Sequence, residues 1–203
     1  MSRTLPSQIL IATKNDGKVE ELRRLMAALP VMLLNLRDFP DIPDVDETGT
    51  TFEENAKLKA SEYARRTGLP AIADDSGLEI DALGGEPGVY SARYGGDELS
   101  FAGKMDLVLE RLRDADSRAA RFTCSIAFSE PNGEVIFTTE GICPGTIAES
   151  PHGTGGFGYD PIFVPDGFDR TFGELPDAIK QQISHRAKAS AVLIRCLLHF
   201  NEV

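Results

Sequence analysis

Short apolar runs typical of buried strands alternate with a helical pattern in the first part of the chain. This alternation restricts the possible folds more than any other feature of the sequence. The sequence predicts a buried strand at residues 8–13, a helix at 16–29 and a second strand at 32–36. Later, residues 121–128 and 135–139 alternate apolar and polar side chains around Pro131-Asn132-Gly133, which predicts a β-hairpin. The combination predicts one α/β domain with a mixed sheet, its 203 residues arranged as one or two lobes.

The remaining elements are placed by local signals. Thr51 and Glu54 form a capping-box pattern that opens a helix running to about Arg66, where Gly68 and Pro70 stop it. The other predicted elements are a short buried strand at 71–73, a strand-like run at 78–80, a helix at 98–113, short strands at 145–148 and 162–164, and a final helix from Ser184.

The chain is strongly acidic, with 21 Lys and Arg against 32 Asp and Glu and a formal charge of −11. Non-specific binding to DNA or RNA needs clustered bases, so this charge disfavours nucleic acid as a partner. A small anionic substrate remains compatible with it if a divalent cation and a few local bases offset the global field.

The cysteine and histidine spacing indicates a reduced, cytoplasmic protein. The three cysteines form no C-x-x-C pair, so we expect them to be reduced core residues: Cys124, Cys143 and Cys196. The three histidines, His152, His185 and His199, are not spaced as zinc ligands. The apolar run at residues 9–12 is too brief for a signal peptide, and the run at 191–200 is too short for a membrane span. We expect no membrane association.

Residues 13–18, between the first strand and the first helix, form a candidate phosphate site: Thr13, Lys14, Asn15, Asp16, Gly17 and Lys18. A strand-to-helix turn directs free backbone N–H groups and the positive end of the helix dipole at one point. The positive charge of Lys18 lies at the positive end of the helix dipole, which is unfavourable, so helix stability does not explain a lysine at this position. The alternative is an ordinary turn with Asn15 as the helix cap.

Asp74 and Asp75 follow a short apolar strand and are candidate cation ligands. Successive strand residues point to opposite faces, so one carboxylate is expected to face a pocket while the other braces the turn. A carboxylate at the carboxyl end of a strand suits Mg²⁺, and Glu47 from an acidic loop is a plausible second ligand. The alternative is a solvated acidic loop with an Asx-turn.

Residues 153–158 match G-x-G-x-x-G, but no helix follows and Pro161 blocks one, which excludes a dinucleotide-binding turn. The loop instead brings Phe157 and Tyr159 beside Asp160, a combination suited to stacking and bonding a nucleobase. The alternative is a structural glycine loop with Phe157 in the core.

Ser184-His185-Arg186 opens the last predicted helix, with Ser184 as its cap and the next two side chains expected to point outward. A lone histidine there is more often structural, although Arg186 and nearby Lys180 favour contact with an anion or a base carbonyl. No Ser-His-Asp or Cys-His nucleophile set is visible, so hydrolysis by a metal-bound water is favoured over covalent catalysis.

Together and in this order, these segments resemble the inosine/xanthosine triphosphate pyrophosphatase family. The resemblance rests on residues 13–18, 47–59, 73–77, 87–93, 153–161 and 184–186, which span nearly the whole chain. It implies hydrolysis of ITP, dITP and XTP to the monophosphate and pyrophosphate, with Mg²⁺, by a homodimer. It also implies an elongated mixed β-sheet with flanking helices, in two lobes with a central cleft that holds the active site.

The resemblance also implies roles by position. Residues 13–18 and Lys59 would hold the triphosphate, Glu47 and Asp75 would bind the metal, and Asp75 would be the general base. The implied substrate and base contacts are Ser76, Phe157, Gly158, Tyr159, Asp160, Lys180, His185 and Arg186. The 6-oxo acceptor of hypoxanthine or xanthine would match donors such as Lys180, His185 or Arg186, whereas the amino group of adenine would not.

Two other functions stay open from the sequence. One is a nucleotide pyrophosphatase acting on modified pyrimidines. The other is a nucleotide-binding sensor without catalysis.

Overall fold

A six-stranded mixed sheet is the centre of the computed structural model, which describes residues 4–201. The strands run in the order β2-β1-β3-β4-β5-β6, with β1 parallel to β2 and β3, and β5 antiparallel to β6. Their bounds are β1 (Gln8–Ile11), β2 (Met32–Asn35), β3 (Ala71–Ile80), β4 (Ala119–Ser129), β5 (Val135–Ile147) and β6 (Phe163–Pro165). The predicted mixed α/β class is confirmed.

The α-helices are α1 (Asp16–Leu25), α2 (Phe52–Thr67), α3 (Phe101–Arg111), α4 (Asp177–Ile183) and α5 (His185–Leu198). The chain divides into two compact units. Unit 1 comprises Met1–Asp75, Cys124–Gly141 and Arg186–Val203, and unit 2 comprises Ser76–Thr123 and Ile142–His185. Strands β3, β4 and β5 each supply residues to both units.

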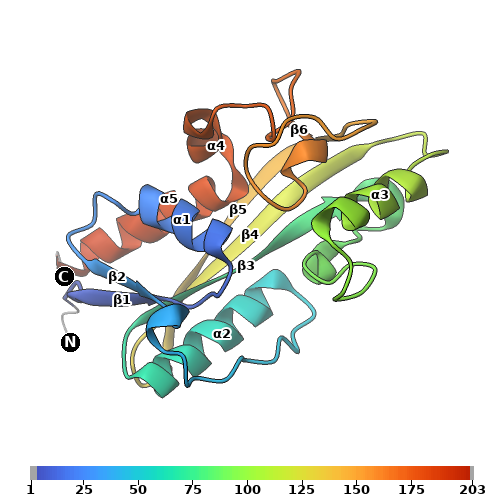
Figure 1. Cartoon of the computed structure of the whole chain (residues 1–203). Helices are drawn as coiled ribbons and strands as arrows, with labels where there is room; N and C mark the ends of the chain where they lie inside the picture. The colour runs from blue at the N-terminus through green and yellow to red at the C-terminus, as the bar shows by residue number, and fades with distance from the viewer. Residues whose placement is uncertain (1–3, 202–203) are drawn as a thin grey trace. The chain divides into compact units, whose positions relative to one another are not determined.

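Unit 1 has three layers, because alternate strand residues bury side chains on opposite faces of the sheet. Ile9 and Ile11 of β1 pack in a cluster with Leu22 of α1 and Leu193 of α5. On the other face, Leu10 and Ala12 pack in a second cluster with three small or aromatic side chains of α2, Ala56, Ala60 and Tyr63. Figure 1 shows α1 and α5 on one side of β1 and β2, with α2 on the other.

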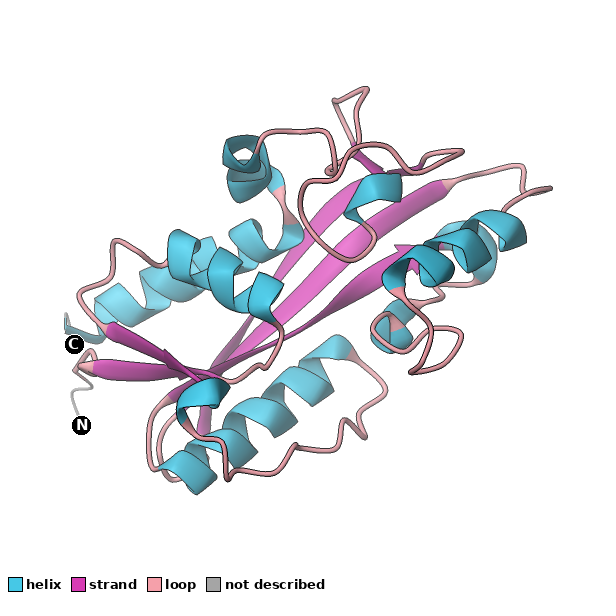
Figure 2. Ribbon diagram, viewed as in Figure 1, coloured by secondary structure: helices cyan, strands magenta, loops and turns pink. Residues whose placement is uncertain are grey.

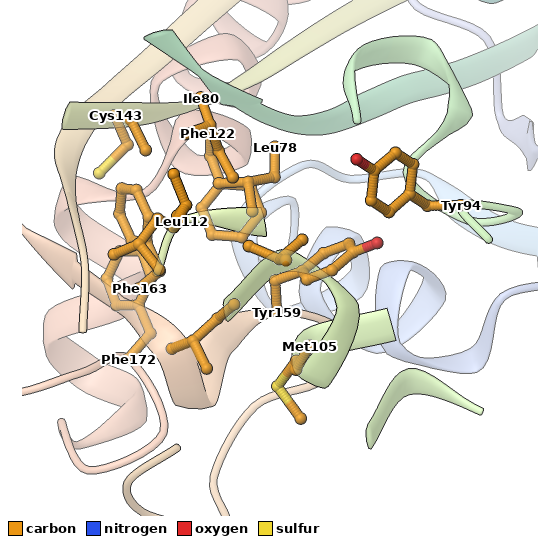
Figure 3. Close-up of a cluster of buried hydrophobic side chains, with 14 of the residues drawn as sticks. Leu78, Ile80, Tyr94, Met105, Leu112, Phe122, Cys143, Tyr159, Phe163 and Phe172 are labelled. Carbon is orange, nitrogen blue, oxygen red and sulfur yellow. The ribbon is translucent and has the colours of Figure 1, made fainter. Parts of the chain in front are cut away.

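Unit 2 has an aromatic core of its own (Figure 3). Phe122 of β4 packs against Phe163 with ring centroids 4.6 Å apart, and Phe163 stacks on Phe172 at 5.5 Å. Tyr159 is buried in the same cluster with Leu78. Between β5 and α4 the backbone is mostly irregular, drawn as loop in Figure 2, so this core fixes a segment that has little regular hydrogen bonding.

Helix α2 begins with the predicted capping box. The Thr51 side chain accepts a hydrogen bond from the Glu54 N–H at 3.2 Å, and the Glu54 carboxylate accepts from the Thr51 N–H at 3.2 Å. The helix ends at Gly68, whose φ of 69° is left-handed. Glycine adopts that conformation without a steric cost, which explains why the helix stops there.

The structure corrects two predicted strands and adds one helix. The strand predicted to end at residue 73 and the run at 78–80 are one continuous strand, β3, so Asp74 and Asp75 lie mid-strand and form no Asx-turn. Two short runs predicted near residues 135–139 and 145–148 likewise form one strand, β5. Helix α4 was not predicted, because its seven residues are too few for a clear apolar period.

The hairpin prediction is confirmed. The Glu130 N–H donates to Glu134 O at 2.9 Å, and Gly133 adopts a φ of 84° between β4 and β5. All three cysteines are free, with Cys124 and Cys143 buried and Cys196 partly buried. Among the residues described, no helix is both long enough and apolar enough to cross a membrane.

Replacing Thr51 with alanine tests the cap of α2. Thr51→Ala removes the acceptor for the Glu54 N–H, so we expect it to lower the free energy of unfolding by about 1 kcal/mol. Urea unfolding of this variant and of Thr154→Ala, which changes an exposed loop threonine, measures the difference. Equal losses in the two variants would contradict the capping role.

Candidate active site

The acidic pair lies where β3 extends beyond its neighbour β1. Ile11 at the end of β1 pairs with Ile72, and the Ala12 N–H donates to Ile72 O at 2.8 Å. Asp74 and Asp75 come directly after this point and are both buried. The end of β1 and the turn into α1 therefore lie beside the two carboxylates, although β3 itself continues to Ile80.

Asp74 is bound by cations on the face of the sheet that carries α1 and α5. Lys18 Nζ lies 2.6 Å from Asp74 Oδ1, and Arg186 Nε donates to Asp74 Oδ2 at 2.8 Å. The Cys124 thiol donates to the same Oδ2 at 2.9 Å. Arg186, 1% exposed, also bonds Glu21 of α1. This network joins β3, β4, α1 and α5 through one buried carboxylate.

Asp75 is bound on the opposite face, by helix α2. Lys59 Nζ donates to Asp75 Oδ1 and to Glu47 Oε1, each at 2.7 Å, and to the Asp74 carbonyl oxygen at 3.0 Å. Asn55 Nδ2 donates to Asp75 Oδ2 at 3.3 Å, while its own oxygen accepts the Gly49 N–H at 2.8 Å. The prediction that the two acids face opposite sides is confirmed.

The two carboxylates differ in pKa because their surroundings differ. Burial raises the pKa of Asp74, but Arg186 and Lys18 outweigh it and hold that pKa well below its usual range. Burial also raises the pKa of Asp75, and here it prevails over the opposing effects of Lys59 and Lys18. Asp74 is therefore charged at neutral pH, whereas Asp75 is the more basic carboxylate.

The turn from β1 into α1 is capped by Asn15, whose side chain accepts from the Lys18 N–H at 3.1 Å. Thr13 Oγ1 accepts the Asn15 N–H at 3.2 Å. Lys14 and Asp16 are exposed and pair with Asp44 and Arg37. The first-turn N–H groups of Asp16 and Gly17 precede the intrahelical bonds of α1, which is the arrangement that binds anions.

In unit 2, the loop after residue 153 closes over a buried ion pair. Asp160 Oδ2 pairs with Lys180 Nζ at 2.5 Å and accepts the Phe157 N–H at 2.8 Å. Lys180 Nζ also lies 4.7 Å from the centroid of the half-buried Phe157 ring. At Gly156, with φ 69°, an added Cβ would lie 2.0 Å from Asp160 Oδ2, so this loop needs glycine to approach the carboxylate.

The other predicted contacts of unit 2 are partly or wholly buried. The Tyr159 hydroxyl donates to Ser91 O at 2.9 Å, and burial raises the pKa of that phenol. The His185 ring stacks on Phe122 with centroids 4.7 Å apart. Ser76 on β3 and Gly158 in the loop are half-buried.

The structure brings one group of predicted residues together in unit 1, namely Lys18, Glu47, Lys59, Asp75 and Arg186. The expectation that His185 and Arg186 point outward from α5 is wrong, because both are buried at the start of the helix. Our sequence reasoning gave no role to Glu21, Asn55 or Cys124. Only Asn55 carried a signal, as a polar residue on the apolar face of α2.

Comparison with known proteins adds independent findings. A model of the Ham1 family matches residues 9–196. A protein of Geobacter sulfurreducens called dITP/XTP pyrophosphatase is 48% identical over 189 residues, covering 92% of this chain and 94% of the relative. One of the same name from Geobacillus kaustophilus is 51% identical over 184 residues, covering 90% of each. The structure of a HAM1 protein from Coxiella burnetii superposes with a TM-score of 0.87 at 41% identity, covering 96% of this chain and all of that one.

Replacing Asp74 with asparagine tests the buried network. Asp74→Asn leaves the Arg186 guanidinium buried with half its compensating charge removed, so we expect a loss of about 3 kcal/mol in unfolding free energy. Urea unfolding at pH 7 measures it, with the exposed Asp41→Asn as the matched control.

The unfolding free energy lost in Asp74→Asn should become smaller as the pH falls. The folded-state pKa of Asp74 is lowered, so its stabilisation is present above the unfolded pKa of about 4 and is lost as the pH falls through the folded value. The gap between wild type and Asp74→Asn should narrow below about pH 4. A gap that widens with acidity would contradict the assignment.

Proposed function

The chain belongs to the Ham1 family, and from this premise we propose that it hydrolyses ITP, dITP and XTP to the monophosphate and pyrophosphate. The observation that carries the proposal is the convergence of Glu47 and Asp75 on one cation position. Lys18 Nζ lies 3.5 Å from the Asp74 carbonyl oxygen, which also contacts the cation at that position. Two carboxylates on a cation beside an anion-binding turn suit metal-assisted attack on a phosphate. Such a reaction would remove deaminated purines from the nucleotide pool.

The oxygen atoms at this position fit Mg²⁺. Glu47 Oε1, Asp75 Oδ1 and the Asp74 carbonyl oxygen lie within 3.0 Å of the same ammonium nitrogen. Within residues 4–201, no group of three or more histidine, cysteine or carboxylate side chains is arranged to hold a metal. One or two carboxylates completed by water and substrate phosphates are typical of Mg²⁺. When bound, the ion would supply charge neutralisation for the phosphate oxygens.

We assign Asp75 as the general base that accepts a proton from the attacking water. Asp75 is buried and lies at the proposed cation position, so its carboxylate can accept a proton from a water held there. Asp75 would accept a proton from water as the water oxygen bonds to the α-phosphorus. The bond from that phosphorus to the bridging oxygen breaks, and pyrophosphate leaves with the electron pair.

Lys18, Lys59 and the turn at residues 13–18 would stabilise the departing pyrophosphate. Lys18 Nζ is held 2.6 Å from the Asp74 carboxylate, which fixes the position of the ammonium before substrate arrives. Preorganised positive groups lower the cost of charge that develops on a leaving group. The carboxylate of Asp74 therefore acts as a positioning group, on the face opposite Asp75.

Base recognition is assigned by the resemblance to Ser76, Phe157, Gly158, Tyr159, Asp160, Lys180, His185 and Arg186. The Asp160–Lys180 pair supports part of this proposal, because it combines a fixed acceptor with a fixed donor beside the Phe157 ring. A 6-oxo purine can accept from such a donor, whereas adenine presents an amino group there. Arg186 is already bonded to Asp74 and Glu21, so we propose that it also acts by holding Asp74.

We further propose that the whole chain acts as a single catalytic domain and assembles as a cytoplasmic homodimer. Both proposals rest on the family resemblance. Light scattering of the purified protein would test the assembly, and a monomer at working concentration would contradict it.

A substrate panel tests the reaction itself. We expect Mg²⁺-dependent release of pyrophosphate from ITP, dITP and XTP at rates at least about 100-fold above those from ATP, because binding groups matched to a 6-oxo group leave adenine unpaired. Comparable turnover of ATP would contradict the specificity. Preferential turnover of modified pyrimidines, or tight nucleotide binding without turnover, would favour the two alternative functions.

Replacing Asp75 with asparagine tests the proposed base. Asp75→Asn keeps the shape of the side chain but cannot accept the proton, so we expect kcat to fall by about 100-fold or more. Asp46→Asn, an exposed carboxylate in the acidic loop, should retain activity. Full activity in Asp75→Asn would exclude the assigned role.

A further inference from the structure

We propose that Lys59 is an internal counter-cation that takes the place of the metal until a nucleotide arrives. Its ammonium neutralises Glu47 and Asp75 in the free protein and moves to the triphosphate when the metal and nucleotide bind together. The inference rests on the proposed function, because it concerns the same two carboxylates.

The contacts of Lys59 are those of a bound cation. Three oxygen atoms surround its Nζ: Glu47 Oε1 and Asp75 Oδ1 at 2.7 Å, and the carbonyl oxygen of Asp74 at 3.0 Å. Lys59 itself is 8% exposed. The ammonium therefore fills the position at which both carboxylates can reach one ion.

The Lys59 ammonium and a divalent metal ion compete for the same two carboxylates. Glu47 and Asp75 carry two negative charges, and one of these is neutralised by Lys59. A divalent ion added with Lys59 in place would bring three positive charges against two negative ones at close range, which is unfavourable. The ammonium must leave for the divalent ion to bind both carboxylates.

A displaced ammonium needs another partner, because a buried charge without one is strongly unfavourable. The carboxylate of the adjacent Asp74 is already paired on its own face of the sheet with Lys18 and Arg186. The phosphates of a nucleotide would supply the missing charge. Divalent metal is therefore expected to bind weakly alone and tightly with a triphosphate, with Lys59 coupling the two events.

The test measures Mn²⁺ binding to nucleotide-free protein, using the electron paramagnetic resonance signal of free Mn²⁺. Lys59→Gln removes the competing charge, so we expect Mn²⁺ to bind at least about tenfold more tightly than to wild type. Lys59→Arg retains the charge and should bind as weakly as wild type. Lys57→Gln, which breaks an exposed pair with Glu53 on the same helix, is the matched control and should also match wild type.

The double variant Lys59→Gln/Glu47→Gln checks where the additional Mn²⁺ affinity arises. Loss of Glu47 should abolish the tighter Mn²⁺ binding of Lys59→Gln. Unchanged or weaker Mn²⁺ binding in Lys59→Gln, or a gain that survives loss of Glu47, would overturn the inference. Circular dichroism melting establishes that each variant is folded.

A second measurement uses wild-type protein, so it does not depend on Lys59→Gln folding. With ¹⁵N-labelled lysine, the buried Lys59 ammonium should give a nuclear magnetic resonance signal that is absent in Lys59→Arg. We expect this signal to persist with Mg²⁺ alone and to shift with Mg²⁺ plus the α,β-methylene analogue of dITP. The same shift with Mg²⁺ alone would overturn the inference. Pyrophosphate release from XTP by wild type tests the proposed function separately.

Discussion

The placement of two adjacent aspartates inside β3 is the constraint on which the site in unit 1 depends. Adjacent strand residues face opposite sides of a sheet, so each buried carboxylate must find its own cations. Asp74 obtains Lys18 and Arg186 from helices α1 and α5, and Asp75 obtains Lys59 from α2. Three helices are thereby tied to a single pair of residues on the central strand.

Because they lie on opposite faces, the two carboxylates have different partners and suit different proposed roles. Asp74 is saturated by positive and thiol donors and keeps a low pKa, which suits a fixed anchor for Lys18. Asp75 shares one ammonium with Glu47 and has a raised pKa, which suits proton transfer. Neighbours in sequence thus have different surroundings because the sheet turns their side chains to opposite faces, and the roles that we propose for them follow from that difference.

Local sequence signals predicted most of the helices and strands. Contacts between residues far apart in the sequence could not be predicted from such signals. The hairpin at Gly133, the capping box at Thr51 and the opposed faces of the aspartates follow from turn chemistry and strand period. The continuity of β3 was missed, because Ser76-Gly77 is typical of a turn while the sheet imposes extended backbone. The burial of Arg186 was missed as well, since its partners, Asp74 and Glu21, lie 112 and 165 residues away in sequence.

Isotope labelling tests whether water attacks the α-phosphorus of the nucleotide, the position at which Asp75 is proposed to act. Hydrolysis of XTP in H₂¹⁸O, followed by mass spectrometry of both products, shows which phosphorus the water attacked. We expect one ¹⁸O atom in the nucleoside monophosphate and none in pyrophosphate. Label in pyrophosphate would mean attack on the β-phosphorus, and it would contradict the assignment of the site.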